Sequence, residues 1–386
     1  MVRRTRALTG EVPAMPDGGS HHDVVVVGGG QAGLAIGYHL MQQGCDFLIL
    51  ERDHDVAHAW RDRWESLTLF TPRAYDSLPG LDFPGNPDGY PTREEVLAYL
   101  QRYAAHFDLP VRLRTPARGL RRDGDRFVIE LEDGPITANQ VVLATGPFQE
   151  PRIPAFADRL APEVVHMHST GYRRPADLPA GRTLIVGGGN TGYQIAHELA
   201  ATRETHIAIG TRQSALPQRL FGRDLFWFLT KTGLIYKSVE TRVGRRMRQN
   251  ETLVGPLPKV AKQLGVVSHG RATDASGRRV TFADGSQIEV DGVVWATGFR
   301  YDHSWIDLPI TGEDGQITHH RGVTEIAGLY TLGLQWQYTR GSALLGFVKD
   351  DAAYLADQIA ARALLASPPP ASARQASGAT TATQGD

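Results

Sequence analysis

The chain has 386 residues, of which 41% are hydrophobic and 22% charged, and its formal net charge is −1. This length favours two domains with sizeable cores. The near-zero net charge gives no field for nucleic acid or a membrane surface, and no apolar run reaches the ~20 residues of a membrane span. The single cysteine, Cys45, excludes an intramolecular disulfide, favours a reducing, cytoplasmic location and excludes electron relay through a cysteine pair.

The segment from Asp23 to Glu51 has the pattern of a dinucleotide-binding unit. Valines 24–27 predict a strand buried on both faces, and a G-x-G-x-x-G fingerprint then opens an apolar-periodic helix. The next strand, 47–50, ends on Glu51, 18 residues after the last fingerprint glycine, close to the ~20 expected for the acid that binds a ribose. The glycines permit a tight turn and close approach of a pyrophosphate to the helix N-terminus. We therefore predict an FAD site at Gly28, Gly30, Gln31, Ala32, Gly33, Glu51 and Arg52.

The stretch between the two nucleotide units begins with a long Pro- and aromatic-rich connection, which is typical of a functional loop. Thr92 to Phe107 predicts a helix capped by Thr92 and Glu95. Residues 111–114, 119–122 and 127–131 predict a short antiparallel meander. A buried strand then ends at Ala144, Thr145 and Gly146, and the prolines of 147–154 mark the first domain crossing.

The fingerprint recurs after a second strand that starts at Thr183. It comprises Gly187, Gly189, Asn190, Thr191 and Gly192, and a helix and the strand 206–209 follow. This strand does not end on an acid, and Arg212 stands just beyond it. A guanidinium suits a ribose 2′-phosphate, which a carboxylate would repel. The second unit is therefore predicted to bind NADPH.

The remaining pattern predicts an α/β fold with two Rossmann-like domains, the NADP domain inserted into a discontinuous FAD domain. The expected FAD domain comprises 23–154 and 290–366, and the NADP domain comprises 155–289 with a largely helical insertion at about 221–262. The insertion is expected either to cover the active-site mouth or a subunit contact, or to be an ordinary packed helix pair. Ala296, Thr297 and Gly298 repeat the earlier strand end, a helix is expected from Ser342 to Leu365, and 1–22 and 367–386 are expected to be disordered tails.

Several ordered motifs resemble the flavin-containing monooxygenase superfamily. The similarity is greatest to its short bacterial branch of NADPH- and FAD-dependent oxidoreductases, which is related to the plant auxin-forming monooxygenases. The motifs are the two fingerprints, Trp60–Pro72, Tyr90–Thr92, Ala144–Phe148, His168–Tyr172, Ala296–Phe299 and Arg340–Gly346. The resemblance implies that Trp60, Arg63, Trp64, Leu69 and Thr71 lie along the flavin. It also implies that the helix beginning near Ser342, Ala343 and Leu344 points its N-terminus at the flavin pyrimidine edge, and that Thr71, His168 and Tyr172 are catalytic candidates.

The activity implied by the resemblance is an NADPH-dependent FAD monooxygenase. It would transfer one oxygen atom from O2, through a C4a-(hydro)peroxyflavin, to nitrogen or sulfur of a small organic molecule. Baeyer–Villiger or 2-oxo-acid-decarboxylating oxygenation is the enzymatic alternative. An NADPH oxidase or electron-transfer reductase and a non-catalytic nucleotide sensor are alternatives of other classes. A homodimer is left open.

Several side chains have two interpretations. His54, His58, His166 and His168 suggest metal ligands, but no cysteine or carboxylate evidently completes a set, so no metal is predicted. Asp350 and Asp351 are expected to be structural, whereas Trp336, Gln337 and Tyr338 suit either a pocket wall or the core.

Overall fold

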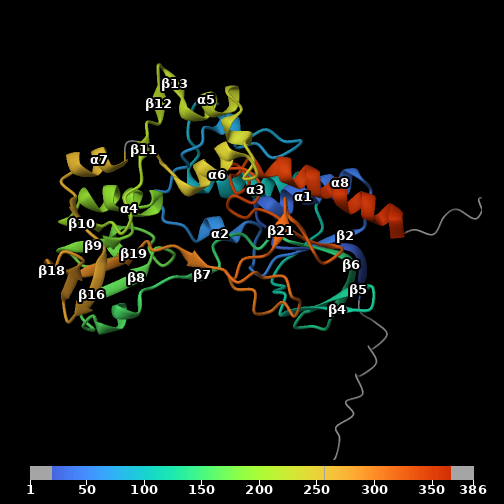
Figure 1. The fold of residues 1–386 in the computed structure, drawn as a ribbon, viewed down its shortest axis with the longest axis horizontal. Coiled ribbons are helices and arrows are strands. Elements are labelled where there is room, and N and C mark those ends of the chain that lie inside the picture. The colour runs from blue at the N-terminus through green and yellow to red at the C-terminus, as the bar shows by residue number, and fades with distance from the viewer. Residues whose placement is uncertain (1–19, 256, 367–386) are drawn as a thin grey trace, which may run out of the picture.

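The structure is a computed structural model that describes residues 20–255 and 257–366. It has two halves lying side by side, each built around a largely parallel sheet (Figure 1). The strands of the small sheet come from 165–295, and those of the large sheet come from both sides of that segment in the sequence, 21–143 and 319–331. This interleaving confirms the predicted α/β class with one Rossmann-like unit inserted into another.

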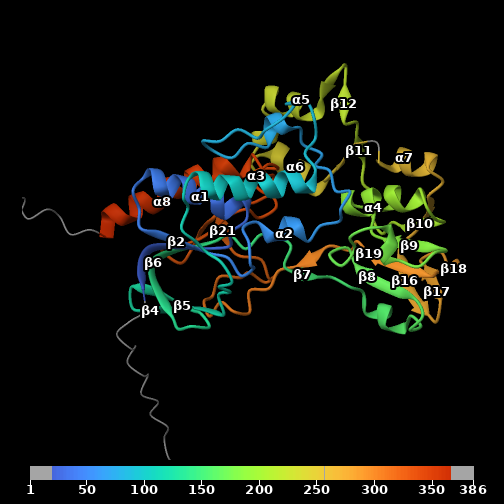
Figure 2. The same cartoon turned by 180° about the vertical axis from the view of Figure 1, so that it is seen from behind.

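The large sheet has the strand order β21-β22-β23-β6-β1-β2-β3, and β4 and β5 extend it from β6. The four valines of β1 are buried because they meet helices on one face of the sheet and the β4–β6 layer on the other. Helices α1, α3 and α8 pack on the same side (Figure 2). The strands are β1 (His21–Val27), β2 (Phe47–Leu50), β3 (Val111–Arg112), β4 (Gly119–Asp123), β5 (Arg126–Glu130), β6 (Ile136–Leu143), β21 (His319–His320), β22 (Val323–Thr324) and β23 (Leu329–Thr331). The helices are α1 (Gln31–Gln42), α2 (His58–Arg61), η1 (Arg73–Tyr75), α3 (Arg93–His106) and α8 (Val348–Ala366).

The small sheet has the strand order β15-β10-β9-β19-β8, and a three-stranded antiparallel sheet, β16-β17-β18, packs beneath it. Its strands are β8 (Val165–His168), β9 (Thr183–Val186), β10 (Thr205–Ala208), β15 (Val267–His269) and β19 (Gly292–Trp295). The antiparallel strands are β16 (Ala272–Ser276), β17 (Arg279–Phe282) and β18 (Gln287–Glu289). The helices of this half are η2 (Ala155–Arg159), η3 (Pro175–Asp177), α4 (Asn190–Ala200) and α7 (Leu257–Gln263).

The chain crosses between the halves twice, and the two crossings pair with each other. Strand β7 (Glu150–Pro151) runs antiparallel to β20 (Phe299–Arg300), and both lie between the sheets in Figure 1. Pro151 has no amide to donate, so the pairing is short. The predicted crossing at 147–154 therefore contains one strand of a two-stranded ribbon that joins the halves.

The segment expected as an insertion rises from the small-sheet half and packs against the other half. It contains β13 (Arg223–Asp224), α5 (Leu225–Lys231), η4 (Leu234–Tyr236), α6 (Arg242–Gln249), β14 (Leu253–Val254) and most of α7, and the short strands β11 (Ala215–Leu216) and β12 (Arg219–Leu220) precede it. Phe226 is 2% exposed and packs with Phe70, Tyr75 and Phe347 of the large-sheet half. The Tyr90 hydroxyl donates to Asp224, 2.6 Å away, which also caps α5. The segment therefore links the halves instead of standing free.

Three expectations about elements were wrong. The last helix begins at Val348 and not at Ser342, because a Cβ on Gly346 would lie 2.2 Å from the Tyr75 carbonyl oxygen, and this close backbone packing keeps 341–347 in turns. Residues 111–112 do not join a meander but pair parallel with β2, so the antiparallel unit is β4-β5-β6. His21 and His22 belong to β1 and not to a tail.

The expected tails otherwise lie outside the described residues. No described helix combines the length and the apolar character that crossing a membrane requires.

Two candidate dinucleotide sites and the junction between them

The first fingerprint forms a cradle that leaves room for a phosphate. Gly28 has φ +117°, and a Cβ there would lie 2.4 Å from the Ala144 carbonyl oxygen. A Cβ on Gly33 would lie 1.9 Å from the Gly28 oxygen, whereas Gly30 has nothing within 4 Å. Gly30 caps α1 without a side-chain hydrogen bond, and within the described chain the amides of 31–33 have no acceptor. Open space at unpaired helix-terminal amides fits an anionic pyrophosphate.

The second fingerprint repeats this geometry. Gly187 has φ +128°, with Ala296 in place of Ala144 as the backbone neighbour 2.1 Å from the added Cβ. A Cβ on Gly192 would lie 1.9 Å from the Gly187 oxygen, and Gly189 again has open space. Gly189 has backbone angles of −81° and 178°, compared with −81° and −172° at Gly30. Asn190 and Thr191, both partly buried, begin α4. Both predicted cradles are therefore present, and the residues fit two dinucleotides.

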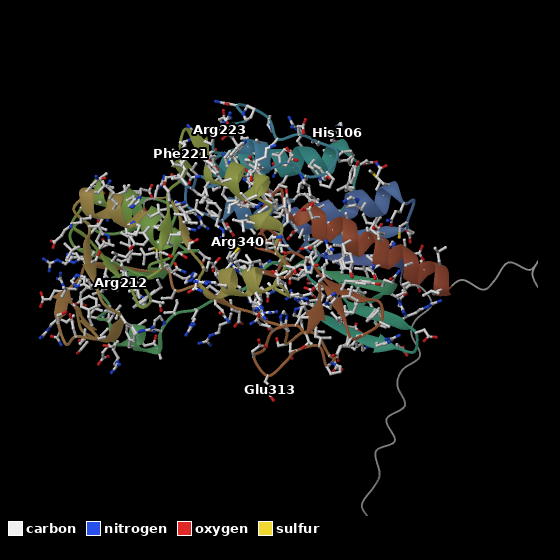
Figure 3. All side chains as sticks on the ribbon, turned by 45° about the horizontal axis from the view of Figure 1, so that its top comes forward. His106, Arg212, Phe221, Arg223, Glu313 and Arg340 are labelled. Atoms are coloured by element: carbon white, nitrogen blue, oxygen red, sulfur yellow. The ribbon has the colours of Figure 1, made fainter. Side chains whose placement is uncertain are left out.

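The two sites differ in the charge beside the second strand. Glu51 is 8% exposed and accepts hydrogen bonds from the Gly29 amide at 2.9 Å and the Asp53 amide at 3.0 Å. Arg212 is exposed on the small-sheet half (Figure 3), and no described carboxylate lies within ion-pair distance of it. Arg52 is also exposed and pairs with Asp53. A fixed acid thus marks the first site and an unpaired cation the second.

Four predicted site residues lie together at the start of α1. The Trp60 indole donates to the Gln31 Oε1 at 2.9 Å, and the Gln31 amide donates to the Ala343 carbonyl at 3.3 Å. A Cβ on Gly333 would lie 2.8 Å from that of Ala32. The structure therefore brings the 57–63 loop and the 333–347 turns to the first cradle, although the latter is not the predicted helix N-terminus.

A buried acid accompanies Thr71. Thr71 is 3% exposed, and its hydroxyl donates to Asp76 Oδ1 at 2.6 Å; Asp76 is fully buried, and its Oδ2 has no partner. Burial raises the pKa of Asp76 to about 8, against the Thr71 hydrogen bond and the charge of Arg73. The pair can therefore hold a proton at neutral pH. Asp76 was not predicted as a site residue because no sequence motif distinguishes it from the loop around it.

Arg63 and His168 meet at the domain crossing. The Arg63 guanidinium lies 4.6 Å from the Phe148 ring centre and 5.9 Å from that of Phe299, and makes no ion pair with any described residue. Burial lowers the pKa of Arg63 to about 10. The His168 Nε2 lies 3.1 Å from the Gly298 carbonyl oxygen, and burial lowers the pKa of His168. A neutral His168 that donates to Gly298 would fix the second crossing.

Two predicted site residues lie elsewhere. Trp64 and Tyr172 are 4% and 0% exposed and pack in the core beside α4, where the Tyr172 hydroxyl donates to Glu198 at 2.7 Å. These contacts indicate packing roles. Leu344 packs against the 221–262 segment.

The remaining predicted site residues make hydrogen bonds that order the local backbone and loops. The Leu69 amide donates to the Pro91 carbonyl at 2.9 Å, the exposed Thr145 hydroxyl accepts from Gln149, and the Thr297 hydroxyl donates to the Arg152 carbonyl. Gly146 and Gly298 have φ of +72° and +81° with open space around them, so each turns the chain away from its sheet. Ser342 accepts hydrogen bonds from the Tyr338 and Thr339 amides, which orders the turn rather than a helix.

The lone cysteine does not face either cradle. Cys45 lies between α1 and β2, its thiol approaches the Asp46 carbonyl at 3.6 Å, and burial raises its pKa to about 11. A thiol held protonated is a poor redox nucleophile. This geometry agrees with the exclusion of a cysteine relay.

Comparison with known proteins shows which family the chain belongs to. Residues 25–220 match the family model described as pyridine nucleotide-disulphide oxidoreductase. An uncharacterized oxidoreductase, CzcO-like, of Geobacillus kaustophilus is 42% identical over 87% of this chain and 98% of its own length. The indole-3-pyruvate monooxygenase YUCCA1 of Oryza sativa is 25% identical over 80% of this chain and 86% of its own length.

A solved structure supports the same assignment to a family of flavin-dependent oxidoreductases. A flavin-containing monooxygenase from Stenotrophomonas maltophilia superposes with a TM-score of 0.76 and 30% identity, over 89% of this chain and 99% of that one. At the level of the family, these findings confirm the predicted oxidoreductase class and its flavin and pyridine-nucleotide cofactors. The chain therefore belongs to the pyridine nucleotide-disulphide oxidoreductase family and, within it, to the flavin-containing monooxygenase superfamily.

Proposed function

We propose that the chain is a cytoplasmic NADPH-dependent FAD monooxygenase that transfers one oxygen atom from O2 to nitrogen or sulfur of a small organic molecule. The observation that carries this proposal is the pair of matching cradles, one beside a buried acid and the other beside an unpaired cation. The first would hold FAD with Glu51 on a ribose, and the second NADPH with Arg212 on the 2′-phosphate. The FAD domain would comprise 23–154 and 290–366, and the NADP domain 155–289.

The protein's part in this reaction is to bind, orient and exclude water. FAD, when bound, supplies hydride acceptance from NADPH and the activation of dioxygen. Trp60 and Gln31 would fix the loop over the first cradle, and Thr71 with Asp76 would hold a proton in a dry site. Phe148 and Phe299, whose ring centres lie 5.1 Å apart at the crossings with the rings tilted by 59°, would limit access of water between the halves.

The absence of a cysteine pair in the sequence limits where the flavin electrons can go. The only cysteine of the sequence, Cys45, is held protonated away from both cradles, so electrons have no thiol route despite the family's name. Dioxygen is then the acceptor that the superfamily offers. Without a substrate, the same chemistry would release hydrogen peroxide, as the oxidase alternative predicts.

Oxygenation of a 2-oxo acid is a second candidate. Relatives named as indole-3-pyruvate monooxygenases act on such an acid, and the junction contains Arg63, a cation without an acidic partner among the described residues. Asp62 acts on Arg63 only through its charge and forms no ion pair with it, so the guanidinium is able to bind a substrate carboxylate bidentately. An Arg63→Met variant would separate the two activities, since it would lose turnover of 2-oxo acids and keep that of thioethers.

The experiment that tests the proposal is anaerobic mixing of the FAD-loaded protein with NADPH, followed by oxygenated buffer with and without substrate. The proposal expects rapid flavin reduction, and less hydrogen peroxide per NADPH when a substrate is present. Peroxide equal to NADPH with every amine, thioether and 2-oxo acid tried would favour the oxidase. A bound flavin that NADPH does not reduce would favour a nucleotide sensor.

A further inference from the structure

A compact cluster of metal-ligating groups lies between Glu51 and Trp60. His54, Asp55 and His58 each offer one ligand atom, and these atoms lie within 4.8 Å of one another. The imidazole rings of the two histidines meet edge to face, with centres 4.6 Å apart. Asp55 Oδ1 lies 2.9 Å from His58 Nδ1 and 4.0 Å from His54 Nε2. Ligands around a tetrahedral zinc ion, with bonds of 2.0–2.2 Å, are about 3.4 Å apart, so small side-chain movements would complete this set.

The two oxygens of Asp55 face different partners. Oδ1 faces the two imidazoles, whereas Oδ2 accepts from the Arg61 Nε at 2.9 Å and from the Gln101 amide at 3.3 Å. The carboxylate is therefore held by one oxygen, which leaves the other oriented toward the imidazoles as a monodentate ligand.

His58 has a partner on its other nitrogen as well. Its Nε2 lies 3.3 Å from Asp62 Oδ2, and Asp62 in turn accepts from Arg173 at 3.2 Å. A carboxylate behind a ligating imidazole orients the ring and increases its basicity, as is usual in metal sites. His54 is 57% exposed in its side chain, so a metal would keep a position open to water.

From this geometry we propose that His54, Asp55 and His58 bind one divalent transition-metal ion of the zinc class. Two imidazoles and one carboxylate suit such ions and not calcium or magnesium, which prefer oxygen ligands. These ligands are not residues predicted for either nucleotide cradle, and the proposal departs from the sequence-based prediction of no metal, which overlooked Asp55 as the completing carboxylate.

The position of the cluster gives the ion a structural role. Ala57, between the ligands, has φ +59°, an uncommon conformation for a residue with a side chain, and its amide donates to the Gly29 carbonyl at 3.1 Å. Trp60, two residues after His58, contacts Gln31 at the start of α1. An ion that bridges His54 and His58 would clamp this loop against the first fingerprint and slow the release of FAD.

The test is calorimetric titration of the FAD-loaded full chain with Zn²⁺, using His54→Gln, His58→Gln and, as a matched control, His106→Gln. His106 is an exposed histidine on α3 (Figure 3) and is not part of the cluster. The proposal expects one tight equivalent, an affinity at least ~10-fold weaker in both cluster variants, and no change in the control. FAD release, followed by flavin fluorescence, should slow with Zn²⁺ in the wild type and in His106→Gln, but not in the two cluster variants.

A His54→Gln variant that binds zinc as tightly as the wild type would overturn the site. Because the His54 side chain is exposed, misfolding would not explain a loss of zinc affinity in this variant. Equal weakening in His106→Gln would also overturn it, since the binding would then belong to scattered histidines. Tight zinc binding with unchanged FAD release would overturn the clamp.

Discussion

A single methyl group at Gly189 should separate nucleotide binding from folding. Its backbone angles of −81° and 178° suit any residue, and nothing lies within 4 Å of an added Cβ. Alanine there loses some capping preference but also lowers the entropy of the unfolded chain, so we expect stability to change by less than about 1 kcal/mol. The same methyl would occupy the space where a pyrophosphate approaches the backbone.

The expected loss is confined to the second cradle. We expect Gly189→Ala to weaken NADP⁺ binding by ~30-fold, about 2 kcal/mol, with FAD content unchanged. Gly192→Ala is the contrasting variant, because its Cβ would lie 1.9 Å from the Gly187 carbonyl oxygen. It should cost about 1–3 kcal/mol of stability through overpacking.

Titration calorimetry with NADP⁺ and thermal unfolding of the two variants provide the assay. Wild-type NADP⁺ affinity in Gly189→Ala would refute the assignment of the cradle. A Gly192→Ala protein as stable as the wild type would refute the steric argument itself.

Three further predictions follow from side chains with defined partners. Arg212→Ala should raise the KM for NADPH by ~10-fold or more and leave the KM for NADH unchanged. Equal increases for the two cofactors would contradict the role of Arg212 at the 2′-phosphate. The pKa of Asp76 is raised to about 8 in the folded state, so ionisation of Asp76 destabilises the folded state increasingly from about pH 4 to 8. Asp76→Asn should therefore reduce the fall of Tm with pH across that range. An unchanged slope of Tm against pH would contradict the burial of this acid. Asp224→Ala removes the cap of α5 and the hydrogen bond from Tyr90, so we expect the protein to lose about 1–2 kcal/mol of stability and to be cleaved faster by proteases near 221–262. Tyr90→Phe removes only the second of these contacts and should lose less stability.

The parts of the fold that were predictable from sequence depend on local geometry. Gly28 and Gly33 must be glycine wherever the turn occurs, because backbone oxygens occupy the space of a side chain. The acid after β2 and the cation after β10 follow at fixed spacing, and the cap of α3 at Thr92 is local as well. Such features reach only a few residues along the chain, so a single sequence contains them.

The features that were missed depend on contacts between distant segments. The start of α8 is set by packing of Gly346 against Tyr75, which no helical pattern records. The burial of Asp76 likewise depends on that contact. Arg340 illustrates the same limit: it lies near the middle of the molecule (Figure 3) and pairs at 3.4 Å with Glu251 of the inserted segment, a contact that spans 89 residues of sequence.

The central claim is that reducing equivalents from NADPH place an oxygen atom from O2 into a small molecule. Its most direct test is turnover under ¹⁸O-labelled dioxygen with NADPH and a panel of amines, thioethers and 2-oxo acids, followed by mass spectrometry. We predict a product that carries one labelled atom for each productive NADPH oxidised. Steady NADPH consumption with all electrons recovered as hydrogen peroxide, and no label in any product, would contradict the account.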